Sequence, residues 1–145
     1  MSLQRVVPFL AVADVARSVA FYVEGLGFEI KLQWRPSGEL RWCQIEQGGA
    51  ALMLQQHGPG QHGDGKGQGV VLCIFCDDAV ALYHRFLANG IAAEEPYVGN
   101  ALWVTRVVDP DGYKVDFESP TDVPEEMTLS QWEARERGKG IAAHE

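Results

Sequence analysis

Hydrophobic and polar positions follow the same pattern twice along this chain. In each copy an apolar run ends at an acidic residue, Asp14 in the first half and Asp78 in the second. Apolar positions then recur at the 3.6-residue period of a helix, from Val15 to Leu26 and from Ala79 to Leu87, and glycines follow each helix. Because an aspartate at this point accepts hydrogen bonds from the first backbone N–H groups of a helix, both helices are expected to begin there. The pattern predicts two similar modules.

Short strand-like runs surround each predicted helix. Together they predict an α+β fold of two tandem β-α-β-β-β modules, residues 5–56 and 69–119. A duplicated unit of this length buries one face and leaves a concave cleft between the halves, so function is expected on the cleft-facing side of the strands. The expected strands are Arg5–Ala13, Phe28–Trp34, Leu40–Glu46 and Ala51–Gln56 in the first module, and Gly69–Cys76, Ala93–Tyr97, Leu102–Val108 and Tyr113–Glu118 in the second.

Two segments lie outside the modules. Residues 57–69 contain six glycines in thirteen positions and predict a flexible linker, within which His57 and His62 would reach a ligand only if the loop folds over the cleft. Since these glycines do not lead from a strand into a helix, they do not predict a phosphate-binding loop. Residues 1–121 are expected to form one domain, and 122–145 a tail with a short helix around Trp132 that docks on the domain or on a partner subunit.

Composition and charge narrow the functional classes. With 145 residues, of which 46% are hydrophobic and 22% charged, the chain predicts a globular protein. Its formal net charge of −8 argues against nucleic acid and anionic membranes as partners and is compatible with a cationic or neutral small molecule. The sequence has neither a membrane-spanning run nor a secretory signal, and its three cysteines make no disulfide framework, so a cytoplasmic location is expected.

Cys73 and Cys76 have the spacing of a metal-binding or redox pair. They lie, however, in an apolar run that predicts a buried strand. Residues three apart in a strand point to opposite faces, so the two sulfur atoms are not expected to converge on a metal ion.

Several motifs, taken together, resemble a known superfamily. They are Val12-x-Asp14, the helix ending in Ala20-Phe21-Tyr22, the following Leu26-Gly27-Phe28, and above all Val108-Asp109-Pro110-Asp111-Gly112 before the last strand. Over residues 5–119 this pattern resembles the vicinal oxygen chelate superfamily, which includes glyoxalase I, extradiol dioxygenases and bleomycin-resistance proteins. The resemblance implies that the two modules form a curved mixed sheet around a cavity, usually in a homodimer.

The resemblance also implies where a metal ion would bind. The positions that carry metal ligands in the enzymes correspond here to Val7, Gln55, Val71 (or Val70) and Asp116. Valine side chains cannot coordinate a metal, and a catalytic zinc or iron takes about three protein ligands, so neither a metal nor another cofactor is expected. The chain therefore looks closest to the bleomycin-resistance branch, whose members bind a drug without chemistry.

Period-two alternation predicts which side chains face the cavity. In the last strand Lys114, Asp116 and Glu118 share one face, and the alternating apolar residues are expected to pack on the helices. The alternatives left open are a solvent-exposed Glu118 paired with Lys114 or Arg106, and a core or dimer-interface position for the tryptophans. The predicted ligand-binding residues are Phe9, Trp42, Gln44, Gln55, Trp103, Arg106, Asp116 and Glu118.

The leading hypothesis is a homodimeric, metal-independent protein that sequesters or carries a small organic molecule, with a cationic aromatic compound as one candidate. The main alternative is an isomerase, lyase or oxidoreductase of the same fold, with an atypical metal site or acid–base catalysis through Asp116 or Glu118. A third hypothesis is an interaction module whose Pro124-Glu125-Glu126 segment binds a partner.

Overall fold

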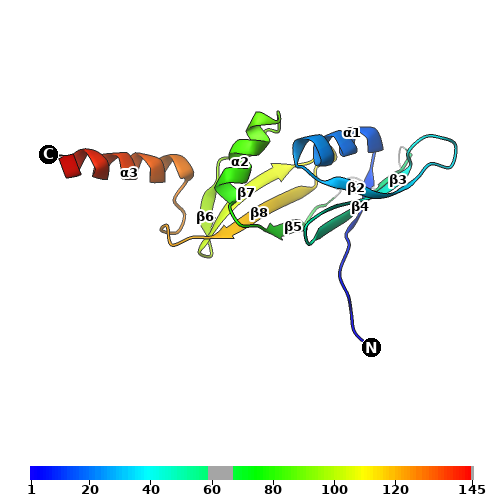
Figure 1. The fold of residues 1–145 in the computed structure, drawn as a ribbon, viewed down its shortest axis with the longest axis horizontal. Coiled ribbons are helices and arrows are strands. Elements are labelled where there is room, and N and C mark those ends of the chain that lie inside the picture. Colours follow the sequence, from blue (N-terminus) through cyan, green and yellow to red (C-terminus); the bar gives the residue numbers. More distant parts are fainter. Residues whose placement is uncertain (59–66, 145) are drawn as a thin grey trace. The chain divides into compact units, whose positions relative to one another are not determined.

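The computed structural model describes residues 1–58 and 67–144 (Figure 1). His62 and most of the predicted linker lie outside these residues. The chain divides into two compact units: unit 1 comprises Met1–Val70 and Val108–Tyr113, and unit 2 comprises Val71–Val107 and Lys114–Glu145. Each unit contains one four-stranded mixed sheet and at least one helix, which confirms the predicted α+β class.

The sheet of unit 1 has the strand order β1-β4-β3-β2. β1 runs parallel to β4, and the other neighbours are antiparallel, as a β-α-β-β-β module requires. The first strand is shorter than expected because pairing begins after Pro8, which has no backbone N–H to donate. The strands are β1 (Phe9–Val12), β2 (Glu29–Trp34), β3 (Trp42–Gln47) and β4 (Ala50–Gln56).

The helix of unit 1 begins at Asp14, as predicted. The Asp14 carboxylate accepts a hydrogen bond from the Arg17 backbone N–H at 3.2 Å, and α1 (Val15–Val19) follows. The next six residues, η1 (Ala20–Gly25), form a π-helix, which the sequence pattern did not predict. Such wide turns often occur at sites where one side chain has a special role. Here the π-helix contains Tyr22, whose buried ring packs edge-on against Phe28.

Unit 1 buries one face of its sheet. The side chains on that face alternate along the strands, and α1 contacts β4. The opposite face contains the predicted ligand-binding residues of this unit. The buried core residues are Leu10, Val12, Cys43, Ile45, Leu52 and Leu54.

The sheet of unit 2 has the matching order β5-β8-β7-β6, with β5 parallel to β8. α2 (Ala79–Ala88) begins at Asp78, whose carboxylate accepts a hydrogen bond from the Ala81 N–H at 2.9 Å. Figure 1 shows α2 lying along this sheet. The strands are β5 (Val71–Phe75), β6 (Tyr97–Gly99), β7 (Leu102–Val108) and β8 (Lys114–Pro120).

Two strand predictions for unit 2 were wrong. The strand expected at Ala93–Tyr97 is β6, which begins only at Tyr97, because Pro96 cannot donate to a ladder. The run around Cys73 was expected to be fully buried, yet Val71 and Phe75 are 38% and 70% exposed. β5 is an edge strand, and its side chains alternate between exposed and half-buried positions.

The core of unit 2 lies between α2 and the sheet. The Phe86 and Phe117 rings are 4.9 Å apart, and the Ser119 hydroxyl accepts a hydrogen bond from the Ala79 N–H at 2.8 Å. Thr105 donates a hydrogen bond to the Ala79 carbonyl at 2.8 Å. Phe117 and Ser119 of β8 therefore face α2, and the even-numbered positions between and beside them face the other way, as predicted.

The C-terminal segment is part of unit 2. Thr128 forms an antiparallel bridge with Tyr97, and Val98 donates a hydrogen bond to the Met127 carbonyl at 3.0 Å, so the segment extends the sheet beyond β6. Trp132 packs against the core cluster that contains Trp103. The following helix α3 (Leu129–His144) is longer than the predicted one. No helix among the described residues is long and apolar enough to cross a membrane.

Candidate functional site

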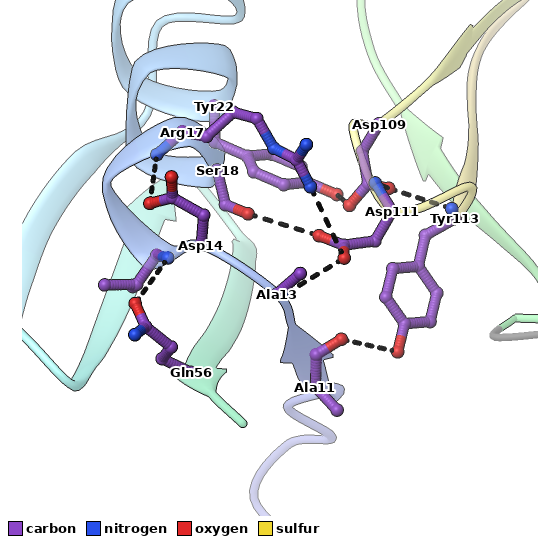
Figure 2. Close-up of polar contacts among 11 residues, drawn as sticks. Ala11, Ala13, Asp14, Arg17, Ser18, Tyr22, Gln56, Asp109, Asp111 and Tyr113 are labelled. Atoms are coloured by element: carbon purple, nitrogen blue, oxygen red, sulfur yellow. Dashed lines mark hydrogen bonds and ion pairs between the residues drawn. The ribbon is translucent and has the colours of Figure 1, made fainter. Parts of the chain in front are cut away.

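The turn at Asp109–Gly112, which contributed most to the family resemblance, has a structural role in unit 1 (Figure 2). The Tyr22 hydroxyl donates to Asp109 Oδ2 at 2.8 Å, and the backbone N–H groups of Asp111 and Tyr113 donate to Asp109 Oδ1 at 2.9 and 2.8 Å. Burial raises the pKa of Asp109, and burial together with this carboxylate raises the pKa of the Tyr22 phenol. Both groups already have partners in the core, so neither is offered to a substrate.

Asp111 and Tyr113 connect this turn through hydrogen bonds to the junction between β1 and α1. Asp111 accepts hydrogen bonds from the Ala13 N–H at 3.0 Å and from the Ser18 hydroxyl at 3.5 Å (Figure 2). The Tyr113 hydroxyl donates to the Ala11 carbonyl at 3.0 Å. The turn thus holds the end of β1 in place, and β1 carries the first candidate ligand-binding residue, Phe9.

Strand pairing arranges the face of unit 1 opposite α1 in two transverse rows. Across β1, β4 and β3, Ala11 pairs with Gln55 and Gln55 with Trp42, while Phe9 pairs with Met53 and Met53 with Gln44. On β2, Trp34 pairs with Trp42 and Leu32 with Gln44. We call this the aromatic face; its first row is Trp34, Trp42, Gln55 and Ala11, and its second is Leu32, Gln44, Met53 and Phe9.

All four candidate ligand-binding residues of unit 1 lie on the aromatic face: Phe9, Trp42, Gln44 and Gln55. The face also contains two residues absent from that set, Leu32 and Trp34. Leu32 and Trp34 belong to this face because of the way β2 pairs with β3. The hydrophobic pattern alone does not specify that pairing.

The aromatic face combines exposed apolar groups with amides. Phe9, Leu32 and Trp34 are 52%, 55% and 53% exposed, and Trp42 is half-buried. The buried Gln44 donates a hydrogen bond to Glu46 Oε2 at 3.2 Å, and Glu46 also pairs with Arg5 at 3.1 Å. Large apolar side chains gathered on one exposed surface are typical of binding sites. Indole rings can stack on a planar molecule while neighbouring amides bond its polar edge.

In unit 2 the candidate residues Arg106 and Asp116 form a bidentate pair. Arg106 Nε donates to Asp116 Oδ1 at 2.7 Å, and its terminal nitrogen donates to Oδ2 at 2.9 Å. These hydrogen bonds raise the pKa of the Arg106 guanidinium, and the Asp116 side chain is almost fully buried. The partner of Arg106 is therefore Asp116 rather than Glu118, which is half-buried on the same face.

Sequence reasoning missed Cys73 as a neighbour of these carboxylates. Because β5 runs parallel to β8, Cys73 lies beside Asp116, and the ligand atoms of Cys73, Asp116 and Glu118 lie within 4.8 Å of one another. Partial desolvation of the sulfur and the Glu118 carboxylate raise the pKa of the Cys73 thiol, so the thiol holds its proton at neutral pH. A cation bound here would have to displace this proton and compete with Arg106 for both Asp116 oxygens.

Trp103 lies elsewhere than its expected cavity-lining position. It is buried in the core with Ala79, Val98 and Leu129, on the face of the sheet that α2 covers. The alternation of side chains along β7 puts Arg106 on the opposite face from Trp103, since the two are three positions apart. The core position that the sequence left open for this tryptophan is the one that the structure shows.

A family model for the glyoxalase/bleomycin resistance protein/dioxygenase superfamily matches residues 2–117. The chain belongs to this superfamily. No curated protein matches it. The match covers both β-α-β-β-β units and includes the Asp109–Gly112 turn, so the resemblance predicted from the sequence is confirmed.

Several solved structures share this fold. TioX from Micromonospora sp. ML1 is 22% identical with a TM-score of 0.65, over 81% of this chain and 98% of that one. TnmS3, described as an antibiotic binding protein from Streptomyces sp. CB03234, is 23% identical with a TM-score of 0.63, over 83% and 99%. A glyoxylase/bleomycin resistance protein/dioxygenase domain from Frankia sp. EAN1pec is 19% identical with a TM-score of 0.65, over 82% and 99%.

The residues at the superfamily's metal-ligand positions do not fit a metal ion. Val7 and Val71 have aliphatic side chains, and Gln55 offers a neutral amide. Asp116 is the remaining ligand, and both of its carboxylate oxygens already accept hydrogen bonds from Arg106. This member of the superfamily therefore lacks the ligand set of the metal enzymes at those positions.

Proposed function

We propose that this chain binds a small, planar organic molecule, cationic or neutral, and sequesters or carries it without a metal ion. The observation that carries this proposal is the aromatic face, where Trp42 and Phe9 lie beside the amides of Gln44 and Gln55 on a single sheet surface. The same fold in TnmS3, described as an antibiotic binding protein, supports it.

Three residues of the aromatic face have defined roles in this proposal. Trp42 stacks on the ring system, an interaction worth about 0.5–2 kcal/mol when the ligand is cationic. Gln55 lies next to Trp42 in the same row and hydrogen-bonds the polar edge of the ligand. Phe9 adds apolar contact from the neighbouring row. These contacts need neither a metal nor a covalent step.

Unit 2 offers a second set of proposed ligand contacts, Arg106, Asp116 and Glu118. Because Arg106 neutralises Asp116 through two hydrogen bonds, Glu118 is the carboxylate that would face a positively charged group. The net charge of −8 favours the approach of a cation.

Equilibrium binding of a planar cation tests the proposal. We expect 9-aminoacridine, which has three fused rings and is cationic at neutral pH, to raise the melting temperature and to bind with one-to-one stoichiometry by calorimetry. Trp42→Ala should weaken this binding by about tenfold, within the range of the stacking energy given above. Trp132→Ala, which removes a tryptophan from unit 2 far along the chain, is the matched control and should leave the affinity unchanged.

Two results would overturn the proposal. One is that neither 9-aminoacridine nor any other planar probe, cationic or neutral, binds to the protein. The other is stoichiometric zinc, manganese, nickel or iron in the purified protein that is lost in the double variant Gln55→Ala and Asp116→Ala, which would favour the enzyme hypothesis instead.

A further inference from the structure

Trp34 lies directly opposite Trp42 on the paired strands β2 and β3. The Arg41 backbone N–H donates to the Trp34 carbonyl at 3.0 Å, which fixes the pairing close to the turn between these strands. Side chains that face each other across antiparallel strands have Cβ atoms about 4.5–5.5 Å apart. The side chains of Trp34 and Trp42 therefore start from neighbouring positions on one face, at the edge strand of unit 1.

A β-bulge places Trp34 on this face. The pairing of β2 with β3 shifts between Ile30 and Leu32, so that Ile30 pairs with the core residue Ile45 while Leu32 pairs with Gln44. In a regular strand, Ile30, Leu32 and Trp34 would all point to the same side. The bulge turns Leu32 and Trp34 to the face opposite α1, at the cost of exposing a tryptophan. Bulges commonly re-aim side chains beside binding sites.

We propose that Trp34 determines the size of the ligand, and that with Trp42 it selects a fused aromatic system of about three rings over a single ring. This inference rests on the proposed function and deepens it. A buried aromatic side chain contributes about 150–250 Å² of contact area. A one-ring ligand can cover one indole and leaves the other exposed, whereas a fused tricyclic ligand covers both.

The order of residues along the first row indicates how such a ligand lies on the face. Trp34, Trp42 and Gln55 follow one another across three neighbouring strands, so the aromatic surface ends at an amide on β4. Leu32 lies in the adjacent row, beside Gln44, and supplies apolar contact without an aromatic ring. The long axis of a fused ring system therefore lies across the strands, with its polar edge at Gln55.

Two probes of equal charge and different size test the inference. We expect 9-aminoacridine to lose about tenfold in affinity in Trp34→Ala, a loss comparable to that of one well-packed aromatic contact. Benzamidine, a cation with one ring, should change by less than twofold. Trp34→Phe should recover most of the 9-aminoacridine affinity. Leu32→Ala, on the same strand and face but in the other row, is the matched control and should affect both probes alike.

The outcomes separate the inference from the proposed function. Unchanged 9-aminoacridine affinity in Trp34→Ala, or an equal loss for both probes, overturns the role of Trp34 while ligand binding by Trp42 stands. If the native protein binds neither probe, the proposed function fails and the inference with it. A dimer that dissociates in Trp34→Ala, with 9-aminoacridine binding unchanged, assigns this surface to a second copy of the chain and overturns the inference. Because Trp34 is half exposed, its removal should leave the melting temperature nearly unchanged.

Discussion

Asp109 is the common acceptor of three hydrogen bonds, one from a residue far away in the sequence and two from its own turn. Its carboxylate accepts hydrogen bonds from the Tyr22 hydroxyl and from two backbone N–H groups of its own turn, and all of these contacts are buried or partly buried. A carboxylate held in this way resists ionisation when desolvation outweighs its hydrogen bonds, and burial does raise the pKa of Asp109.

This raised pKa predicts a pH dependence of stability. A group that binds its proton more tightly in the folded state stabilises the fold below its unfolded pKa of 3.8, and that contribution is lost as pH rises through the folded pKa. Asp109→Asn removes the titration. The melting temperature of the native protein relative to Asp109→Asn should therefore fall as pH increases from about 3.8 towards neutrality. Thermal unfolding at several pH values measures it.

The matched control for this experiment is Asp122→Asn, which removes one negative charge from the surface of unit 2. Parallel melting-temperature profiles for native protein and Asp109→Asn across the acid range would contradict the prediction.

Ala101 adopts a backbone conformation that glycine would adopt at lower cost. It has a φ of +63° and follows Asn100 with a φ of +53°, which together form a left-handed turn between β6 and β7. Ala101→Gly should stabilise the fold by about 0.5–1 kcal/mol because it relieves the contact of Cβ with the backbone. Urea unfolding measures the change. Ala81→Gly, at an exposed position of α2, should instead destabilise by about 1 kcal/mol, and an equal effect of both changes would refute this account.

The first residue of α2 is bonded to the sheet through both of its backbone polar groups. The Ala79 N–H donates to Ser119 on β8, and the Ala79 carbonyl accepts from Thr105 on β7. This arrangement fixes the helix to two strands at its beginning, where its unpaired N–H groups would otherwise need other acceptors.

Ser119→Ala should destabilise the protein more than Asp78→Ala. The serine change leaves the buried Ala79 N–H without its acceptor, at a cost of about 1–3 kcal/mol, whereas loss of the exposed Asp78 cap costs about 1 kcal/mol. Equilibrium unfolding in urea compares the two. Ser130→Ala, at an exposed position of α3, provides a control for serine loss; the reverse order of the two costs would show that the buried bond is unimportant.

Elements with a local signal were predicted well. β7 matches the expected strand Leu102–Val108, because its run is rich in apolar and β-branched residues and the Asp109–Gly112 turn marks its end. Both helix caps were found for the same reason, since Asp14 and Asp78 act within their own first turn. β6 was misplaced because the expected strand included Pro96, which has no backbone N–H to donate to a ladder.

Features that depend on the register between strands were not predicted. The bulge in β2 decides the face of Trp34, and no residue type in that strand marks it. Cys73 was assigned to a buried strand because its run is uniformly apolar, while its exposure follows from the edge position of β5. Four of the eight candidate residues, those of unit 1, share one face because simple alternation was sufficient there.

The acidic character of the whole chain has its own consequence for binding. With a net charge of −8, the protein attracts a cation over distances longer than the stacking contacts themselves. The screening length falls from about 10 Å at 0.1 M salt to about 3 Å at 1 M. The affinity for 9-aminoacridine should therefore decrease severalfold over this range, as measured by calorimetry. Acridone, a neutral molecule with the same three-ring shape, should not show this decrease; equal salt dependence for both would contradict the role of charge.

Residues Val108–Tyr113 belong to unit 1, although the strands before and after them belong to unit 2. A gene cut within the glycine-rich segment would therefore not yield two self-sufficient pieces. The first piece would lack the partners of the Tyr22 hydroxyl and of the Ala13 N–H, since Asp109 and Asp111 would be encoded on the second. Such pieces should regain a native circular dichroism spectrum only when they are mixed. The protein would then be a two-part complementation system rather than a tandem of separable modules.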